Sequence, residues 1–226
     1  MVPHPRQPGV RAPRPGRGPA RAFRLTAVPA LFAFLATLLV LEQRPVPARA
    51  GTAARLELEQ LVDHAELVLE ARVVAATPRL DAVGRVETEL LLAVDRTFVG
   101  EDLALRSVRV PGGVLPDGRG MLVAGLPRLE TGEEALLFFS AEGSTGWRMP
   151  VGLAQGVLRI RRPAPGRVVL VGDETGLGLA NPGGGGLGES RGRRVLDYAA
   201  VVAELEALAA GREARRAARG VPEHDR

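Results

Sequence analysis

Apolar and polar residues alternate along two stretches of the chain, residues 66–76 and 86–94. A period of two predicts β-strands that bury one face. The residues predicted to share this buried face are Leu67, Leu69, Ala71, Val73, Val86, Thr88, Leu90, Leu92 and Val94. Residues 81–84 between the strands read Asp-Ala-Val-Gly, which predicts a hairpin turn. Residues 56–65 have apolar positions at helical spacing, which predicts a short amphipathic helix.

Shorter apolar runs separated by Gly- and Pro-containing turns occupy the middle of the chain. The further predicted strands are residues 103–110, 120–125, 134–140, 147–153, 156–162 and 167–172. Many short strands with turn residues between them are typical of an antiparallel barrel or sandwich. Helices do not alternate with these strands, which argues against a parallel α/β sheet. Residues 51–172 are therefore predicted to form one mainly β domain, a β-barrel.

The end of the chain changes character twice. Residues 173–194 are rich in Gly, which predicts a loop. Residues 195–211 carry an apolar stripe at helical spacing and end at Gly211, which predicts an amphipathic helix that covers an open face or end of the barrel. Residues 212–226 are charged and rich in Ala and Arg, which predicts a disordered tail.

A basic stretch rich in Pro and Gly opens the chain and precedes an uncharged apolar run, residues 25–41. Ala48 and Ala50 then place small residues where signal peptidase requires them, which predicts cleavage between Ala50 and Gly51. Residues 1–50 are thus predicted to be a signal peptide, and the remainder to be secreted or periplasmic. In the alternative, residues 25–41 stay as a membrane anchor, because their number lies between those typical of a signal peptide and of a membrane span.

Charge is divided unevenly along the chain. Residues 1–50 contain eight Arg and a single acid, whereas residues 51–226 contain 22 basic and 25 acidic residues. A mildly acidic body has little attraction for polyanions, so no nucleic acid is expected as a partner. Contact with a membrane is expected only through an uncleaved leader. The chain has no Cys, which excludes disulfides and thiolate metal sites.

Residues 188–192 read Gly-Glu-Ser-Arg-Gly and fit the G-x-S-x-G pattern of serine hydrolases. That pattern needs a strand running directly into the nucleophile, whereas Ser190 follows a long Gly-rich segment. Only His64 and His224 remain as bases after removal of the leader, and His224 lies in the predicted tail. Asp63 precedes His64 on a predicted helix, where adjacent side chains do not face each other. The pattern therefore predicts a loop residue, with a hydrolase using Ser190 as the alternative.

Two groups of acidic residues flank turns and contain the oxygen ligands that Ca²⁺ prefers. They are Asp95, Glu101 and Asp102, and Glu130, Glu133 and Glu134. Neither group has the alternating spacing of a calcium loop, so both are predicted to be solvated turn acids, with Glu133 bonding loop N–H groups. Arg159, Arg161 and Arg162 predict a solvated strand face. No catalytic, cofactor-binding or metal-binding residue is predicted, and no cofactor.

Five segments of the body resemble a family of uncharacterised bacterial secreted proteins. They are LEQLVDHAELVLEARVV (58–74), VETELLLAVDRTFVGE (86–101), VRVPGG (108–113), VAGLPRLETGEEALLFFS (123–140) and VGLAQGVLRI (151–160). In some relatives such a domain precedes a matrixin-type zinc metallopeptidase domain. The chain has no H-E-x-x-H motif, and His4, His64 and His224 are its only histidines, so the resemblance implies no protease activity.

More distantly, the order of strands is similar to the OB-type barrel of netrin-like domains and of tissue inhibitors of metalloproteinases. Those domains depend on cysteines that this chain lacks, so this resemblance implies an OB-like barrel alone. The sequence as a whole predicts an exported, non-enzymatic β-barrel module that binds an unknown protein or cell-envelope component. A carrier of a small ligand in the barrel interior is a further alternative.

Overall fold

The computed structural model describes residues 52–175, 177–180, 187–188 and 192–218. All of them belong to one compact unit, Ala48–Arg226. The leader and its predicted cleavage site at Ala48, Ala50 and Gly51 lie outside the described residues. None of the helices within the described residues is long and apolar enough to cross a membrane.

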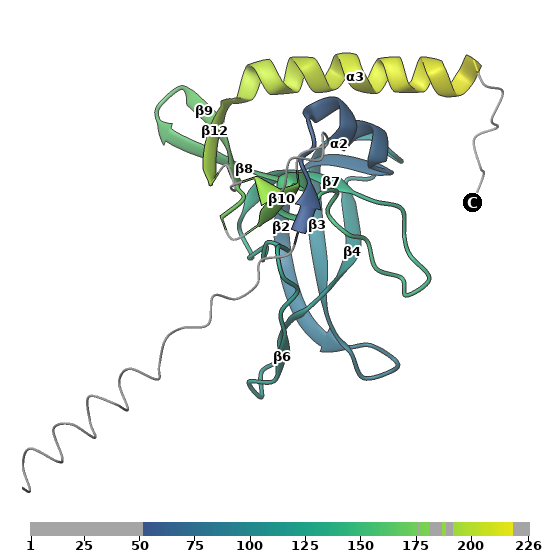
Figure 1. Cartoon of the computed structure of the whole chain (residues 1–226), viewed down its shortest axis with the longest axis vertical. Coiled ribbons are helices and arrows are strands. Elements are labelled where there is room, and N and C mark those ends of the chain that lie inside the picture. The colour runs from purple at the N-terminus through teal and green to yellow at the C-terminus, as the bar shows by residue number, and fades with distance from the viewer. Residues whose placement is uncertain (1–51, 176, 181–186, 189–191, 219–226) are drawn as a thin grey trace, which may run out of the picture. The chain divides into compact units, whose positions relative to one another are not determined.

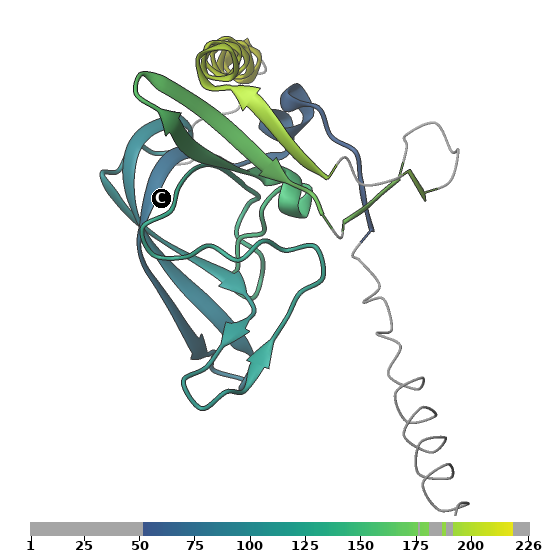
Figure 2. The ribbon, with the colours of Figure 1, turned by 90° about the vertical axis from the view of Figure 1, so that its left-hand side faces the viewer.

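The unit is built on a seven-stranded antiparallel sheet with the order β12-β9-β8-β7-β2-β3-β4 (Figure 1). The strands are β2 (Leu67–Leu80), β3 (Val86–Val99), β4 (Leu105–Pro111), β7 (Glu134–Phe139), β8 (Val157–Ala164), β9 (Arg167–Asp173) and β12 (Arg193–Asp197). The mainly β prediction is confirmed. The predicted closed barrel is not found among the described residues, because β4 and β12 are two separate edges of an open, curled sheet (Figure 2).

Two small sheets and a short 3₁₀ helix complete the β structure. Strand β1 (Thr52–Ala54) pairs in parallel with β10 (Gly178–Ala180), which pairs with β11 (Leu187–Gly188). Strand β5 (Gly113–Val114) pairs with β6 (Gly120–Met121). The 3₁₀ helix η1 spans Leu153–Gly156. The segment predicted as one loop, residues 173–194, thus contributes strands to two sheets.

Alternation places a separate hydrophobic core on each face of the large sheet. One core, called the concave core, contains the predicted face of β2 and β3 together with Leu137 and Phe139 of β7. The second core, on the opposite face, contains Phe138 of β7 and is covered by the helices α2 (Leu58–His64) and α3 (Tyr198–Ala218). The faces predicted for residues 66–76 and 86–94 are therefore confirmed.

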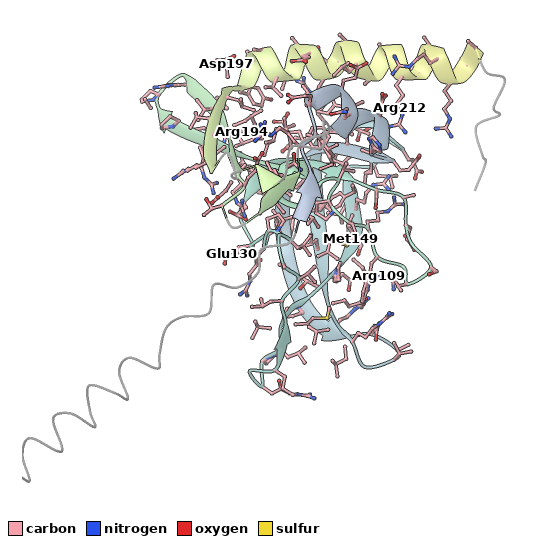
Figure 3. The ribbon with its side chains drawn as sticks, viewed as in Figure 1. Arg109, Glu130, Met149, Arg194, Asp197 and Arg212 are labelled. Carbon is pink, nitrogen blue, oxygen red and sulfur yellow. The ribbon has the colours of Figure 1, made fainter. Side chains whose placement is uncertain are left out.

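Helix α3 differs from its predicted bounds at both ends. It begins at Tyr198, because residues 193–197 pair with β9 as β12 and Asp197 accepts a hydrogen bond from the N–H of Ala200 at 2.9 Å. It continues past Gly211 to Ala218. Arg212 there donates to the carbonyl oxygens of Val62 and Ala65 at the end of α2 (Figure 3). These bonds tie down a segment that composition alone assigned to a disordered tail.

Two of the predicted strands are wrong or much shorter than expected. Residues 147–153 form only an isolated bridge between Pro150 and Phe139, since proline lacks the N–H that a ladder needs and Gly152 turns the chain at φ +64°. Residues 120–125 contain only the two residues of β6. Neither segment forms a strand of the large sheet.

Candidate binding pocket

The hairpin of β2 and β3 extends well beyond the strand on its other side. Strand β7 pairs with Leu67 to Arg72. Beyond it, the N–H of Val73 bonds the carbonyl of Glu133 and the N–H of Gly132 bonds the carbonyl of Val73, both at 2.8 Å. Residues 73–80 and 86–92, called the distal hairpin, are paired further only with β4. The concave core therefore continues along this hairpin without β7, β8 and β9 beside it.

Residues 112–131, called the crossing segment, cover this end of the concave face. They contain β5 and β6, and Figure 2 shows that pair converging with the distal hairpin. Leu129 is buried in the concave core, which anchors the far end of the segment. Between the segment and the hairpin lies a pocket of about 310 Å³. Its apolar lining includes Ala76, Pro78, Leu90, Val110, Met121, Leu122, Val123, Leu126, Leu129 and Pro150.

Glycines allow the crossing segment to approach the sheet so closely. Gly112 and Gly113 have φ angles of +92° and +137°, which side-chain-bearing residues rarely adopt. A Cβ atom on Gly113 would lie 2.5 Å from the hydroxyl oxygen of Thr88. That hydroxyl donates a 2.6 Å hydrogen bond to the carbonyl of Gly112. Residues 111–113 thus connect β4 directly to β5 with positive φ angles at both glycines, and this connection fixes one wall of the pocket.

Exposed apolar side chains surround the pocket at the distal end of the unit. Leu122 is 89% exposed at the pocket itself, and Val83 in the turn of the distal hairpin is 73% exposed. Leu80 and Val114 are also exposed. A group of exposed apolar residues beside an apolar pocket is characteristic of an interaction surface, whereas single exposed ones are ordinary.

Charged side chains at this end are paired among themselves. Arg79 contacts Glu87 at 2.9 Å and Glu89 at 2.8 Å. Arg85 contacts Asp81 at 2.6 Å, and Arg119 contacts Asp117 at 2.8 Å. The hydrogen bonds of Arg85 and Arg119 keep the pKa values of these two aspartates below the ordinary value, against the opposing effect of desolvation. This surface therefore offers apolar contact and little net charge.

Glu87 forms the most buried of these pairs, and sequence analysis did not single it out. Its side chain is almost wholly buried, and it accepts a 2.6 Å hydrogen bond from the indole N–H of Trp147. The guanidinium of Arg85 lies over the face of that indole, 4.4 Å from the ring centroid. Strand alternation predicts Glu87 on the solvated face, and only the loop carrying Trp147 buries it.

Glu133 holds the wall of the pocket formed by residues 128–131. Its carboxylate accepts hydrogen bonds from the backbone N–H of Glu130 at 3.1 Å and from Arg159 and Arg161 at 2.9 and 3.2 Å. Arg159 also donates to the carbonyl of Arg128. Desolvation would raise the pKa of Glu133, but these donors outweigh it and leave the pKa below the ordinary value of 4.5.

These contacts test the predictions made for the acidic groups and the arginines. The prediction that Glu133 bonds the loop backbone is confirmed. Of the arginines predicted to form a solvated face, Arg161 and Arg162 are exposed, and only Arg159 is mostly covered. All three are also ion-paired, because Arg162 contacts Glu134 while Arg159 and Arg161 contact Glu133. Within the described residues no group of Asp, Glu or His has the arrangement of a metal site. Asp95, Glu101 and Asp102 are exposed, with Glu101 3.6 Å from Arg106.

We predict that Glu133 makes stability depend on acid pH. A lowered folded pKa means that the stabilisation is complete above the unfolded pKa and is lost as the pH falls through the folded pKa. Glu133→Gln should lower the free energy of unfolding at pH 7 by about 2 kcal/mol and by much less at pH 3. Urea unfolding at several pH values measures this. Glu142→Gln, whose pairs are long and exposed, is the control; equal pH profiles for wild type and Glu133→Gln would contradict the assignment.

The histidine at the end of α2 shows no catalytic partner. The Nδ1 atom of His64 lies 2.6 Å from the carbonyl oxygen of Gln60, and Asp63 pairs instead with Arg215 of α3 at 3.0 Å. The expectation that Asp63 does not orient His64 is thus confirmed. Ser190 and His224 lie outside the described residues, so the hydrolase alternative stays untested. Phe138 and Phe139 are fully buried and belong to the core.

Comparison of the chain with protein-family models, with curated proteins and with solved structures finds no match. The resemblance to uncharacterised bacterial secreted proteins and to OB-type barrels therefore stays a prediction.

Proposed function

We propose that this chain is an exported, non-enzymatic binding module that receives an apolar segment of a partner polypeptide in the distal pocket. The carrying observation is the pocket of about 310 Å³, which is continuous with the concave core and open beside the exposed Leu122. A pocket of this size accommodates one or two large apolar side chains. Burial of such side chains supplies the main favourable free energy of association.

The polar groups at the pocket support binding more than catalysis. The hydroxyl of Thr88 is engaged by the backbone of Gly112, and Arg128, Glu130 and Thr131 belong to the wall that Glu133 holds in place. Catalytic pockets bring a nucleophile, an acid or a base toward one point. This lining contains no histidine or serine. The ion pairs of the distal end also favour a neutral, apolar partner over an anionic surface.

Export is part of this proposal and is supported by the position of the first strand. Strand β1 begins at Thr52, directly after the predicted cleavage site between Ala50 and Gly51. Cleavage there would leave all of the described helices and strands intact, since the first of them begins at Thr52. The relation to bacterial secreted β-domains is part of the proposal as well. One of the segments that carry this resemblance, residues 123–140, supplies the far wall of the pocket. An OB-like origin of the curled sheet is proposed on the same grounds.

A small apolar ligand is the second candidate, because the pocket volume is also within the range of small-molecule sites. The two candidates differ in what the exposed rim contributes. A polypeptide would cover Leu122 and Val114, whereas an acyl chain would occupy the interior alone.

We predict that N-acetyl-phenylalaninamide, standing in for a partner side chain, binds the pocket with a dissociation constant on the order of 1 mM. Amide chemical shifts of the ¹⁵N-labelled protein should move at the lining residues. Leu122→Asp should weaken binding at least about fivefold at nearly unchanged stability, because Leu122 is exposed. Leu105→Asp, the same change at another exposed leucine outside the lining, should have no effect.

Octanoate serves as the second probe in the same experiment. Shifts at the lining with the amide support a polypeptide partner. Chemical-shift changes with octanoate but not with the amide would contradict the polypeptide partner and support a carrier of a small ligand. No shift with either probe, or equal loss in both variants, would overturn the pocket as the binding site.

A further inference from the structure

Strand β12 is an uncovered edge of the large sheet, at the opposite margin from β4. It pairs with β9 on one side only. The N–H of Glu174 bonds the carbonyl of Gly192, which shows that alternate residues from Gly192 onward direct their backbone groups toward β9. The backbone groups of Arg193, Val195 and Asp197 therefore point outward. Within the described part of the chain they form no backbone hydrogen bond on that side.

The other edge of the sheet is protected in a way that β12 is not. The outward carbonyl of Arg109 in β4 accepts a 2.8 Å hydrogen bond from the N–H of Arg148, and β4 ends at Pro111. Prolines and covering loops are common devices against pairing at a sheet edge. Val195, at the centre of β12, is instead 59% exposed.

The side chains of one β12 strand are complementary to those of a second, antiparallel β12 strand. Arg193, Val195 and Asp197 lie on one face, and all three are exposed. If a second β12 pairs antiparallel about a twofold axis at Val195, each Val195 lies opposite its copy. Each Arg193 then lies opposite Asp197 of the other copy. All of these positions have outward backbone groups, so each pair can exchange both of its N–H···O=C hydrogen bonds.

The two charged groups are available for such pairing. Asp197 uses Oδ1 to cap α3, which fixes its carboxylate where β12 meets the helix (Figure 3). Its Oδ2 has no hydrogen-bond partner among the described residues. Arg193 lies opposite Asp173 on β9, and Oδ1 of Asp173 accepts a 3.0 Å hydrogen bond from the N–H of Thr175. Among the described residues Arg193 forms no ion pair with Asp173. Opposite charges directly across a strand pair stabilise it, and like charges destabilise it.

We propose that β12 pairs with β12 of a second copy of this chain and joins the two sheets across a twofold axis. The interface is isologous, as in most homodimers, and is separate from the distal pocket. Both pockets therefore stay open in the dimer, which presents two binding sites to one partner. Because the paired strands are short, we expect a dissociation constant on the order of 10 µM.

Sedimentation equilibrium of the purified protein tests the proposal. Protein concentrations from about 1 to 300 µM bracket the dissociation constant expected for an interface of this size. Arg193→Asp and Asp197→Arg should each weaken dimerisation at least about tenfold, since like charges then face each other. An equimolar mixture of the two variants should restore it, because each supplies the charge that the other lacks. Arg167→Asp, the same change on the neighbouring strand β9, is the matched control.

Val195→Pro is a second variant that leaves the fold intact. The N–H of Val195 points away from β9, so proline removes no bond of the existing ladder. This variant should be monomeric, with an unchanged circular dichroism spectrum. A wild-type protein that stays monomeric throughout, a dimer insensitive to Val195→Pro, or charge variants that do not restore each other would each overturn the proposal.

Discussion

Replacing Gly156 by alanine should lower the free energy of unfolding by about 3 kcal/mol, near the upper end for an overpacked core. A Cβ atom at this position would lie 2.4 Å from the carbonyl oxygen and 2.8 Å from the nitrogen of Val151. These are backbone atoms, and the same nitrogen donates a 2.8 Å hydrogen bond to the carbonyl of Phe138 in β7. Relief of the overlap must therefore move the chain away from a central strand.

The neighbouring Gln155 adds to this effect. It is buried, accepts a hydrogen bond from the N–H of Leu56 and donates one to the carbonyl of Ala54, both at 2.9 Å. The corner of η1 thus holds the first residues of the compact unit against the sheet. Displacement of Gly156 would weaken these bonds as well, because both residues belong to the same short turn.

Urea unfolding measures this loss, and thermal unfolding should show a fall in Tm of about 9 °C. Gly143→Ala is the matched control, since its nearest neighbour would lie 3.7 Å from the new Cβ. That change should alter stability by less than about 0.5 kcal/mol. Equal stability of the two alanine variants would show that the turn does not approach Val151 so closely.

Replacing Glu87 by alanine should lower the free energy of unfolding by about 2 to 3 kcal/mol, as expected for loss of a buried charged acceptor. The indole N–H of Trp147 and the guanidinium of Arg79 both lose their shared partner. Trp147 is the only tryptophan of the chain, so its emission should shift to longer wavelength as the loop that carries it opens to water.

Glu89→Ala is the control for this change, two residues further along the same strand. Glu89 also binds Arg79, at 2.8 Å, but its side chain is 36% exposed. Exposed ion pairs contribute less than about 1 kcal/mol. Glu87→Gln, which keeps an acceptor for the indole, should have an intermediate effect. An unchanged emission spectrum in Glu87→Ala would contradict the buried contact.

Strand β12 shows why local pattern failed at the end of the chain. Val195 fits the apolar stripe of the following helix, and the preceding residues are rich in Gly. In the structure, Val195 and Leu196 pair with Val171 and Leu170 of β9, which lie far back in the sequence. The hydrogen-bonded pairing with β9 outweighs the weak helix preference of these residues. Asp197 then caps α3, which begins at the next residue.

Only one wall of the candidate pocket could be predicted from the sequence. Alternation predicted the apolar face of β2 and β3, and the two glycines after Pro111 indicated positive φ angles at that point of the chain. Neither pattern shows that β7 extends only to Glu134 at this end, whereas the distal hairpin continues beyond it. Because no strand lies beside that part of the hairpin, Ala76 and Leu90 line a pocket. Likewise, the acids and arginines were each visible in the sequence, but their pairing depends on strands that meet only in the folded sheet.

By itself, the sequence determined the mainly β class, the buried faces of the first two long strands, the short helix before them and the apolar helix after them. These features follow from local periodicity, which depends on neighbouring residues alone. The tertiary structure alone decided that the sheet is open, which edge is covered, that Glu87 is buried and where the pocket lies. Those properties depend on contacts between residues far apart in the sequence, and strand periodicity carries no information about which strands become neighbours.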